Sequence, residues 1–487
     1  MKVAIDSISI TPSDAVGKPM AGYSRPHPAR GILDEVKAHG VLLQHEILGN
    51  VDKNFLLISL DVLKPPMVFC DYVKEQIQEK FQINPNQILI HATHTHSAPD
   101  LTGEFYWPGG MFETIRGILF GLNRNDKMLV WMTNQIVKMV GRLLTKLQPA
   151  KIGWKKVEID NDIIINRRHP ARRTKPPLGV ICFKGIDDNE LIGMLVNVGA
   201  HGTTLSNMND KISADYPGRV VASVNEMTNG KTRAVFFNAA SGDLNPITTC
   251  GTDFDYLEEH HGPVYGQKGE YEDTIRIGKA IAKRALDLAK SIPDDEYYET
   301  IELKSYVRTF WFPMKDFKHY HSDKPLQSTL NRLQNRLIFL VKKYFMFPIV
   351  FAITGHDKEP NFPGLAIKHR FLDINIYTKI QYVQCKCVKD GKRESFNIIT
   401  VPGEAFQNLA NQVMEASPEG IQNSFMFQNS NDWTSYLFDL DEYIEAGGFT
   451  QEGYELLPST TPIAGYYIKN EFFRLFDEIN HGLVSFS

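Results

Sequence analysis

The sequence predicts an α/β fold in which layered, mixed β-sheets are flanked by helices. In the first half of the 487-residue chain, short apolar runs alternate with amphipathic stretches. Strands that alternate with helices are typical of α/β architectures. Several of the apolar runs lead directly into polar loops that contain glycine, as in "VNVGAHGTT" and "FFNAASGD". Because loops at the carboxyl ends of strands build the active sites of such folds, we expect the site there.

The predicted elements follow one another along a chain whose length suits about two to four domains, or one large elaborated domain. Apolar runs predict strands, and amphipathic stretches predict helices. The strands are expected at 54–61, 86–96, 191–204, 232–243 and 395–406, and the helices at 67–81, 128–147 and 272–292.

Residues 297–371 break this rhythm and are interpreted as a helical insertion or subdomain. Apolar residues recur there at spacings of four and three, which predicts an amphipathic helix. They are Leu326, Leu330, Leu333, Leu337, Leu340, Tyr344 and Phe347. The helix either covers the core or forms an apolar lip for a lipid substrate or a membrane surface. The same two interpretations apply to the apolar segment 109–123, and the second of them places a peripheral membrane contact at 109–123 and 326–353.

Composition excludes several classes of protein. Hydrophobic residues make up 43% of the chain and charged residues 23%, with a formal net charge of −4. No basic stripe with interleaved aromatic residues is present, so nucleic acid is not an expected partner. Five scattered cysteines do not form a disulfide framework. The start "MKVAIDSISITP" is not a signal peptide, and no uncharged apolar run approaches about 20 residues. We expect a cytoplasmic or peripheral membrane protein, or a secreted one if the sequence is a processed form; the oligomeric state stays open.

Three histidines in "ILIHATHTHSAPD" form the first candidate cluster. If the strand at 86–96 is extended, His94 and His96 point the same way and His91 does not. Pro99 disfavours a helix across them. Such a pair can place two imidazoles on one metal, or one on the metal and the other beside the substrate. Ordinary polar packing is the alternative.

Polar side chains also follow four other predicted strands or loops. His201 ends the strand in "VNVGAH", Arg167 lies in "IINRRHPARR", and Glu404 follows Pro-Gly in "ITVPGEAF". The turn "NAASGDLNP" contributes Asn238, Ser241, Asp243 and Asn245. Taken singly, each cluster is explained by caps, turns or solvated charge. Together they place ligand-type or anion-binding side chains at the end of one strand after another.

These motifs resemble those of the neutral (non-lysosomal) ceramidase family. "ATHTHSAP", "INRRHP", "VGAHGTTLS", "NAASGDLNP" and "VPGEAF" occur in the family's order and approximate spacing. The tail "SNDWTSYLFDLDEY" is similar to its Asn-x-Tyr-x-x-Tyr segment, with Trp433 in place of the first tyrosine. The opening "ITPSDAVGKPMAGYSRP" also resembles the family's N-terminal stretch, so the match covers the catalytic domain nearly end to end. The resemblance therefore implies that residues 1–487 form a single catalytic domain.

The resemblance implies a catalytic zinc site. The metal ligands it implies are His94, His201, Glu404 and Tyr436, and it places His96 and Arg167 beside them. Two imidazoles, a carboxylate and a phenolic oxygen suit Zn²⁺ and leave room for water.

Two further features depart from the family. Asn245 stands in "GDLNP" where the family carries a serine treated as catalytic. An amide cannot act as a nucleophile, although it can donate a hydrogen bond to an oxyanion. Family members continue into a C-terminal β-sandwich of immunoglobulin type, whereas this sequence ends at Ser487. Properties of that domain are therefore not expected here.

The sequence therefore predicts a zinc-dependent amidohydrolase that cleaves the N-acyl bond of ceramide or a related N-acyl lipid by metal-activated water. His96 is the expected proton-transfer residue, and His96, Arg167 or Asn245 would donate to the oxyanion. One alternative keeps the zinc hydrolase fold with a non-lipid N-acyl substrate. The other is an inactive homologue that binds a lipid or a partner, against which the retention of all four implied ligands argues.

Overall fold

The structure is a computed structural model. It describes residues 1–23, 25–45, 54–103, 105, 125–159, 163–167, 175–249, 269–313, 333, 337, 340–341, 344, 366–370, 373–389, 391–441, 461 and 463–484.

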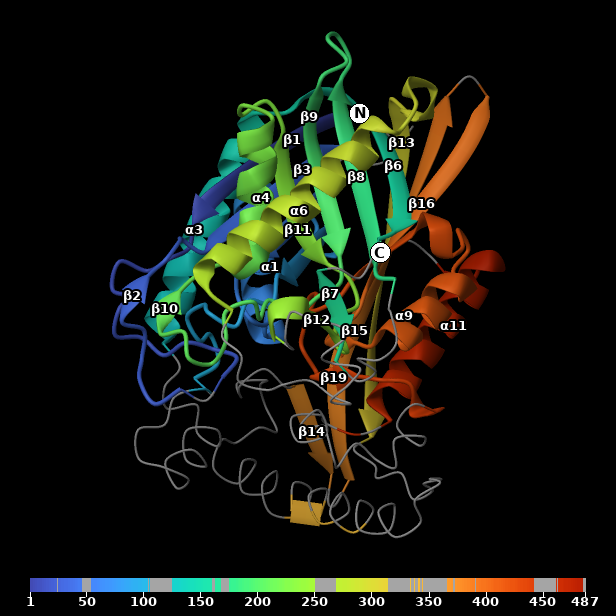
Figure 1. The fold of residues 1–487 in the computed structure, drawn as a ribbon. Helices are drawn as coiled ribbons and strands as arrows, with labels where there is room; N and C mark the ends of the chain where they lie inside the picture. The colour runs from blue at the N-terminus through green and yellow to red at the C-terminus, as the bar shows by residue number, and fades with distance from the viewer. Residues whose placement is uncertain are drawn as a thin grey trace.

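An eight-stranded mixed sheet forms the centre of the fold, with strand order β11-β9-β8-β6-β1-β3-β4-β5 (Figure 1). Most neighbours are antiparallel, but β4 and β5 are parallel, as are β9 and β11. In chain order the strands are β1 (Lys2–Ser9), β3 (Lys37–Gln44), β4 (Asn54–Leu60), β5 (Ile88–Ala92), β6 (Gln148–Glu158), β8 (Pro177–Gly185), β9 (Leu191–Val198) and β11 (Arg233–Asn238).

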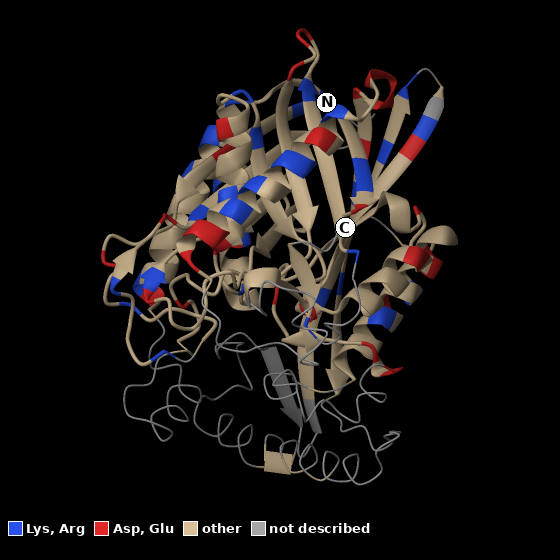
Figure 2. Cartoon of the chain, in the orientation of Figure 1, with Lys and Arg blue, Asp and Glu red and all other residues tan. Residues whose placement is uncertain are grey.

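Four helices cover one face of this sheet. They are α1 (Met67–Phe81), α3 (Asp126–Thr145), α4 (Asp215–Met227) and α6 (Tyr271–Lys290). The apolar faces of α1 and α3 pack on one half of the sheet, and those of α4 and α6 on the other half. Their opposite faces carry charges of both signs, interspersed rather than gathered in a basic patch in the view of Figure 2.

A second sheet packs on the opposite face of the first. Its order is β13-β15-β16-β18, with β14 also paired to β15. The strands are β13 (Thr300–Pro313), β14 (Ala366–Arg370), β15 (Asp373–Lys389), β16 (Lys392–Thr400) and β18 (Ser424–Phe427). Helices α9 (Gln407–Ala416) and α11 (Ala464–Asn480) cover its outer face, away from α4 and α6 (Figure 1). The layers are therefore helix, sheet, sheet, helix, which confirms the predicted fold class.

The eight-stranded sheet is curved so strongly that its two edges meet. Strand β11 lies against β3, β4 and β5. The Ser59 hydroxyl donates to the carbonyl of Phe236 at 2.7 Å, and the backbone N–H of Asn238 donates to Nε2 of His91 at 2.9 Å. Nδ1 of His91 lies 2.9 Å from the same hydroxyl. His91 is thus a buried connection between the edges, and the curvature brings the carboxyl ends of β5, β9 and β11 together.

Both described ends of the predicted insertion are strands rather than helix. β13 pairs with β15 in antiparallel register from Thr300↔Val388 to Pro313↔Asn375. Ile301 and Leu303 alternate with polar residues along β13 and face the core between the sheets. The segment 109–123 and most of 326–353 lie outside the described residues. No helix within the described ranges is long and apolar enough to cross a membrane.

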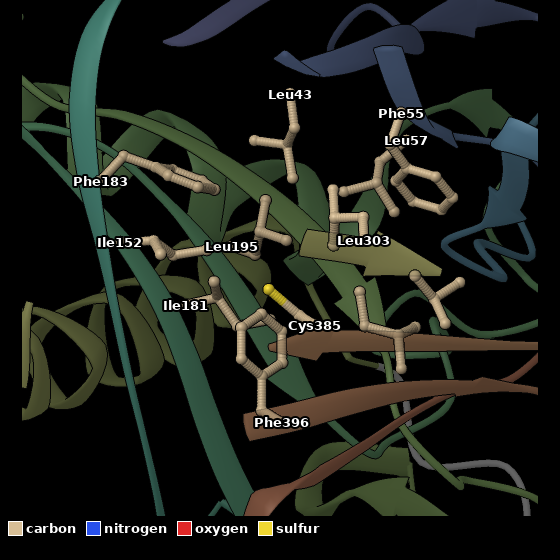
Figure 3. A pocket seen from close by; sticks show the side chains of 12 residues that line it. Leu43, Phe55, Leu57, Ile152, Ile181, Phe183, Leu195, Leu303, Cys385 and Phe396 are labelled. Carbon is tan, nitrogen blue, oxygen red and sulfur yellow. The ribbon is translucent and has the colours of Figure 1, made fainter. Parts of the chain in front are cut away.

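A small cavity lies between the two sheets (Figure 3). Leu43, Phe55, Phe183, Leu303 and Phe396 are among its apolar lining residues. The Cys385 thiol is its one titratable group, and burial raises the pKa of that thiol well above its usual value. We interpret this cavity as a packing defect of the core, because it offers no groups for polar chemistry.

Candidate metal centre

Three buried histidines and one buried glutamate converge where the strands end. Nε2 of His94 lies 3.3 Å from Nε2 of His96 and 3.2 Å from Oε2 of Glu404. Nε2 of His201 lies 3.0 Å from that same oxygen. Among the described residues, His94, His96 and His201 form the one group of three or more His, Cys, Asp or Glu side chains whose ligand atoms lie close enough to hold an ion.

His94 reaches the site through a left-handed turn and not along an extended strand. β5 ends at Ala92, and His94 has a φ of 66°, so the expected continuation of the strand is wrong. The His94 amide donates to the carbonyl of Val62, and its Nδ1 donates to the carbonyl of Leu63 at 2.7 Å. These bonds orient the His94 ring toward His96, although the extended strand from which the two side chains were expected to point the same way is absent.

His201 is fixed by a short pair of strands beyond the end of β9. Its amide donates to the carbonyl of Leu244, and its Nδ1 donates to the same carbonyl at 3.1 Å. Leu244 begins β12 (Leu244–Pro246), which pairs with β7 (Ile164–Asn166). Asn245 is buried in β12, next to the residue that orients His201. Burial, reinforced by the charge of Arg167, lowers the pKa of His201 to about 4, so the ring is neutral at pH 7.

The loops that carry His94 and His201 touch at Gly202. An isolated bridge joins Thr95 to Gly202, and the His96 amide donates to the carbonyl of Gly202. A Cβ atom on Gly202 would lie 2.6 Å from the carbonyl oxygen of His94 and 2.7 Å from Cα of Thr95. Glycine is therefore required by the close approach of the two backbones.

We expect Gly202→Ala to separate the two loops. Because the added methyl group meets backbone atoms, the cost is about 1–3 kcal/mol of unfolding free energy, and zinc affinity falls with it. Urea unfolding and a zinc titration measure the two effects. Gly31→Ala is the matched control, since its Cβ meets only the flexible Lys211 side chain at 3.4 Å. Equal zinc affinity of the two variants would show that the backbone contact at Gly202 does not position the metal ligands.

Glu404 reaches the site from the segment that follows β16 of the second sheet. It begins β17 (Glu404–Ala405), which pairs in parallel with β19 (Tyr436–Leu437), so Glu404 lies opposite Tyr436. The short pairs β7–β12 and β17–β19 lie near one another beyond the strand ends (Figure 1). Burial raises the pKa of Glu404, but His94 and His201 outweigh this effect and hold the pKa well below its usual range. The side chain is therefore a carboxylate.

Tyr436 and Arg167 pack beside His201. The ring of Tyr436 stacks on that of His201 with centroids 6.3 Å apart, and the Arg167 guanidinium lies 5.3 Å from the centroid of the Tyr436 ring. Arg167 also donates to the carbonyl of Gly242 at 2.6 Å. Both predicted residues thus adjoin the cluster, and ligation by the Tyr436 hydroxyl stays a prediction.

The chemistry of these donors fits a metal ion. His94 and His201 each donate Nδ1–H to a carbonyl, which leaves Nε2 of both rings directed at the Glu404 carboxylate. Imidazole nitrogens and a carboxylate oxygen that converge in this way are the ligand types that zinc binds. Two ligands of one tetrahedral zinc at about 2.0–2.1 Å lie about 3.3 Å apart. The separations of 3.2 and 3.0 Å between Oε2 of Glu404 and Nε2 of His94 and His201 are close to that value.

The surroundings of His96 were not identified by the sequence motifs. The ring of Tyr23 lies 4.8 Å from that of His96, and Arg25 donates to the His96 carbonyl at 2.8 Å. A Cβ on Gly22, whose φ is 96°, would lie 2.5 Å from the His96 ring. These residues belong to "AGYSRP". No residue pattern in this stretch predicted a functional site, and only the family resemblance included it. Burial, with His94 and His201 nearby, lowers the pKa of His96 well below its usual value.

Other polar residues singled out in the sequence do not join the cluster. The Ser241 amide donates to Oε1 of Gln428 at 2.9 Å, and the Gln428 amide nitrogen donates to the Ser241 hydroxyl. Asp243 accepts hydrogen bonds from Asn166 and from the backbone of Gln407, which makes it a structural link. Residues 168–174 of the arginine-rich loop lie outside the described residues.

Comparison with known proteins gives one family and one fold. Residues 6–332 match the family described as "Neutral/alkaline non-lysosomal ceramidase, N-terminal". The fold is similar to the crystal structure of neutral ceramidase from Pseudomonas aeruginosa, with a TM-score of 0.70 and 17% identity over 100% of this chain and 75% of that one. A structure described as "Ceramidase complexed with C2" matches with a TM-score of 0.69 and 17% identity, over 100% and 76%. No curated protein matches.

Proposed function

Because the chain belongs to the neutral/alkaline non-lysosomal ceramidase family, we propose that it hydrolyses the amide bond of ceramide or a related N-acyl lipid with the help of zinc. The observation that carries this proposal is the convergence of Nε2 of His94 and Nε2 of His201 on one oxygen of the Glu404 carboxylate. His94, His201 and Glu404 would hold the ion, and Tyr436 would complete the set. Zinc bound there supplies Lewis-acid activation of a water molecule.

His96 is the proposed proton-transfer residue. It is buried beside His94, and among the described residues no hydrogen-bond partner is within reach of its Nδ1. A neutral imidazole can take a proton from the attacking water and pass it to the leaving nitrogen. The oxygen of water adds to the carbonyl carbon and the C–N bond breaks. One proton of the water passes through His96 to the leaving nitrogen, and the amine also takes the second proton when the new acid ionises, so the products are a carboxylate and an ammonium group.

Arg167 and Asn245 are proposed to stabilise the oxyanion that forms during attack. Both lie beside His201, Arg167 against Tyr436 and Asn245 in the strand that orients His201. A guanidinium and a carboxamide are both hydrogen-bond donors, and donors aimed at a developing oxyanion lower the barrier. On this account Asn245 needs no nucleophilic role, because water is the nucleophile.

An exposed apolar stripe supports a lipid substrate and peripheral membrane contact. Within 326–353 the described residues Leu333, Leu337, Leu340, Val341 and Tyr344 are all exposed. Their spacing places them along one helical face, and exposed apolar side chains in such a row favour a lipid surface.

We expect Leu333→Glu/Leu337→Glu to lower binding to phosphatidylcholine vesicles, because each change removes buried apolar area at the lipid surface. Co-sedimentation measures the effect, with a fall of about 10-fold or more expected for the two changes together. Met208→Glu/Leu483→Glu is the control, since both residues are exposed apolar side chains elsewhere on the surface. An equal loss of vesicle binding in the two double variants would contradict the proposed membrane contact at Leu333 and Leu337.

A substrate screen tests the proposal. Ceramide in vesicles, N-acyl amino acids and N-acyl sugar amines are incubated with the protein, with and without a chelator. We expect fatty-acid release from ceramide or another N-acyl lipid, its loss with chelator and its return with zinc. Hydrolysis of water-soluble amides alone would favour the non-lipid alternative, which Asn245 motivates. Zinc binding without hydrolysis of any amide would favour an inactive binding protein.

A further inference from the structure

The two carboxylate oxygens of Glu404 have different partners. Oε2 faces Nε2 of His94 and Nε2 of His201, at 3.2 and 3.0 Å. Oε1 accepts a hydrogen bond from the indole Nε1–H of Trp433 at 3.0 Å. The indole thus engages the oxygen that does not point to the histidines.

The ammonium group of Lys64 lies over the face of the Trp433 indole. Its Nζ lies 4.1 Å from the centroid of the Trp433 ring and 5.4 Å from that of Phe105, and the residue is 3% exposed. A cation this close to the face of a tryptophan is attracted to it, most strongly where water is excluded. The cation also draws electron density from the ring, which strengthens Nε1–H as a donor.

The segments that carry Trp433 and Lys64 also position the other candidate ligands. Lys64 follows Leu63, whose carbonyl accepts the Nδ1–H of His94. Trp433 lies in the loop that leads into Tyr436, and this loop is fixed to the Pro402–Glu404 segment. The amide and hydroxyl of Thr434 both donate to the carbonyl of Pro402 at 2.7 Å. The Glu404 amide donates to the carbonyl of Ser435 at 2.9 Å. Trp433 therefore has little freedom to move away from Glu404.

We propose that Trp433, backed by Lys64, is a positioning residue that restricts Glu404 to binding the metal through Oε2 alone. This inference rests on the zinc site of the proposed function and deepens it. A carboxylate whose second oxygen is hydrogen-bonded binds through one oxygen, which keeps the coordination number low and leaves a position for water. Without the indole N–H, Glu404 is free to rotate and bind through both oxygens, which occupies that position.

Trp433→Phe is the direct test, because it removes the N–H donor and keeps an aromatic ring for Lys64. We expect a 10- to 100-fold loss of zinc affinity in competition with a chromophoric chelator, the range typical of residues that orient metal ligands. In the cobalt(II)-substituted protein, the visible d–d absorbance should weaken as the coordination number rises. Lys64→Met should shift both readouts in the same direction, by less.

Trp154→Phe is the matched control, because its indole N–H donates to Oδ1 of Asn423 at 3.0 Å, away from the site. Circular dichroism of the zinc-free proteins verifies folding, and Lys64→Met decides the question if Trp433→Phe does not fold. Wild-type zinc affinity and an unchanged cobalt spectrum in Trp433→Phe would overturn the inference and leave the proposed function standing. Weaker zinc binding by that variant, with no amide hydrolysed by the wild type, would support the inference and refute the function.

Discussion

His201→Ala should abolish amide hydrolysis and lower zinc affinity by more than about 100-fold, beyond the loss caused by residues that merely orient ligands. His201 is fully buried, and both of its ring nitrogens have partners, the Leu244 carbonyl and the Glu404 carboxylate. Metal activation of water lowers the barrier by several kcal/mol. Its loss therefore corresponds to a fall in kcat/KM on the order of 10³-fold or more. Zinc content and fatty-acid release, measured on the same preparation, provide the result.

His39→Ala is the control for the loss of a buried histidine. Nε2 of His39 lies 3.2 Å from Oδ2 of Asp61, so this variant also breaks a buried histidine–carboxylate contact. It should lose stability to thermal unfolding and still bind zinc. If His201→Ala kept stoichiometric zinc and turnover, the metal site assigned here would be wrong.

His96→Ala should keep zinc and lose turnover. Proton transfer by a positioned imidazole contributes about 10²–10⁴-fold, so kcat should fall by that factor while the zinc content stays at one per chain. The prediction separates two roles for His96, because its Nε2 is close enough to His94 to belong to the metal group. The measurement combines zinc analysis with single-turnover kinetics, and His94→Ala is the comparison that should lose the metal.

Two outcomes would change the role of His96. Full turnover in His96→Ala, together with loss of the metal in His94→Ala, would show that His96 has no catalytic role. Loss of zinc in His96→Ala would make it a third imidazole ligand.

The fold class follows from local patterns, because strands and helices each have a characteristic spacing of apolar residues in the sequence. The strand β13 was missed, because its antiparallel partner β15 follows only after residues 314–372. The meeting of the sheet edges at Ser59 and Phe236 is likewise non-local, since these residues are 177 positions apart. Local periodicity carries no information on such pairs, so the curvature that assembles the site could not be foreseen.

For the site, the motifs identified the residues but not the way in which they are held. The resemblance named His94, His201 and Glu404, and the structure brings these three together. The extended geometry expected for His94 was wrong, because a left-handed turn at a non-glycine residue has no dependable sequence signal. The link from Lys64 through Trp433 to Glu404 joins three distant segments of the chain, and only the folded structure shows it.

Titration of the zinc-free protein with zinc, followed by fatty-acid release from ceramide or the best N-acyl lipid of the screen, tests the central claim most directly. We predict that activity is absent from the chelated protein, rises in proportion to added zinc and reaches its plateau at one equivalent per chain. Full activity in the chelated protein, or saturation with zinc without cleavage of any N-acyl amide, would contradict it.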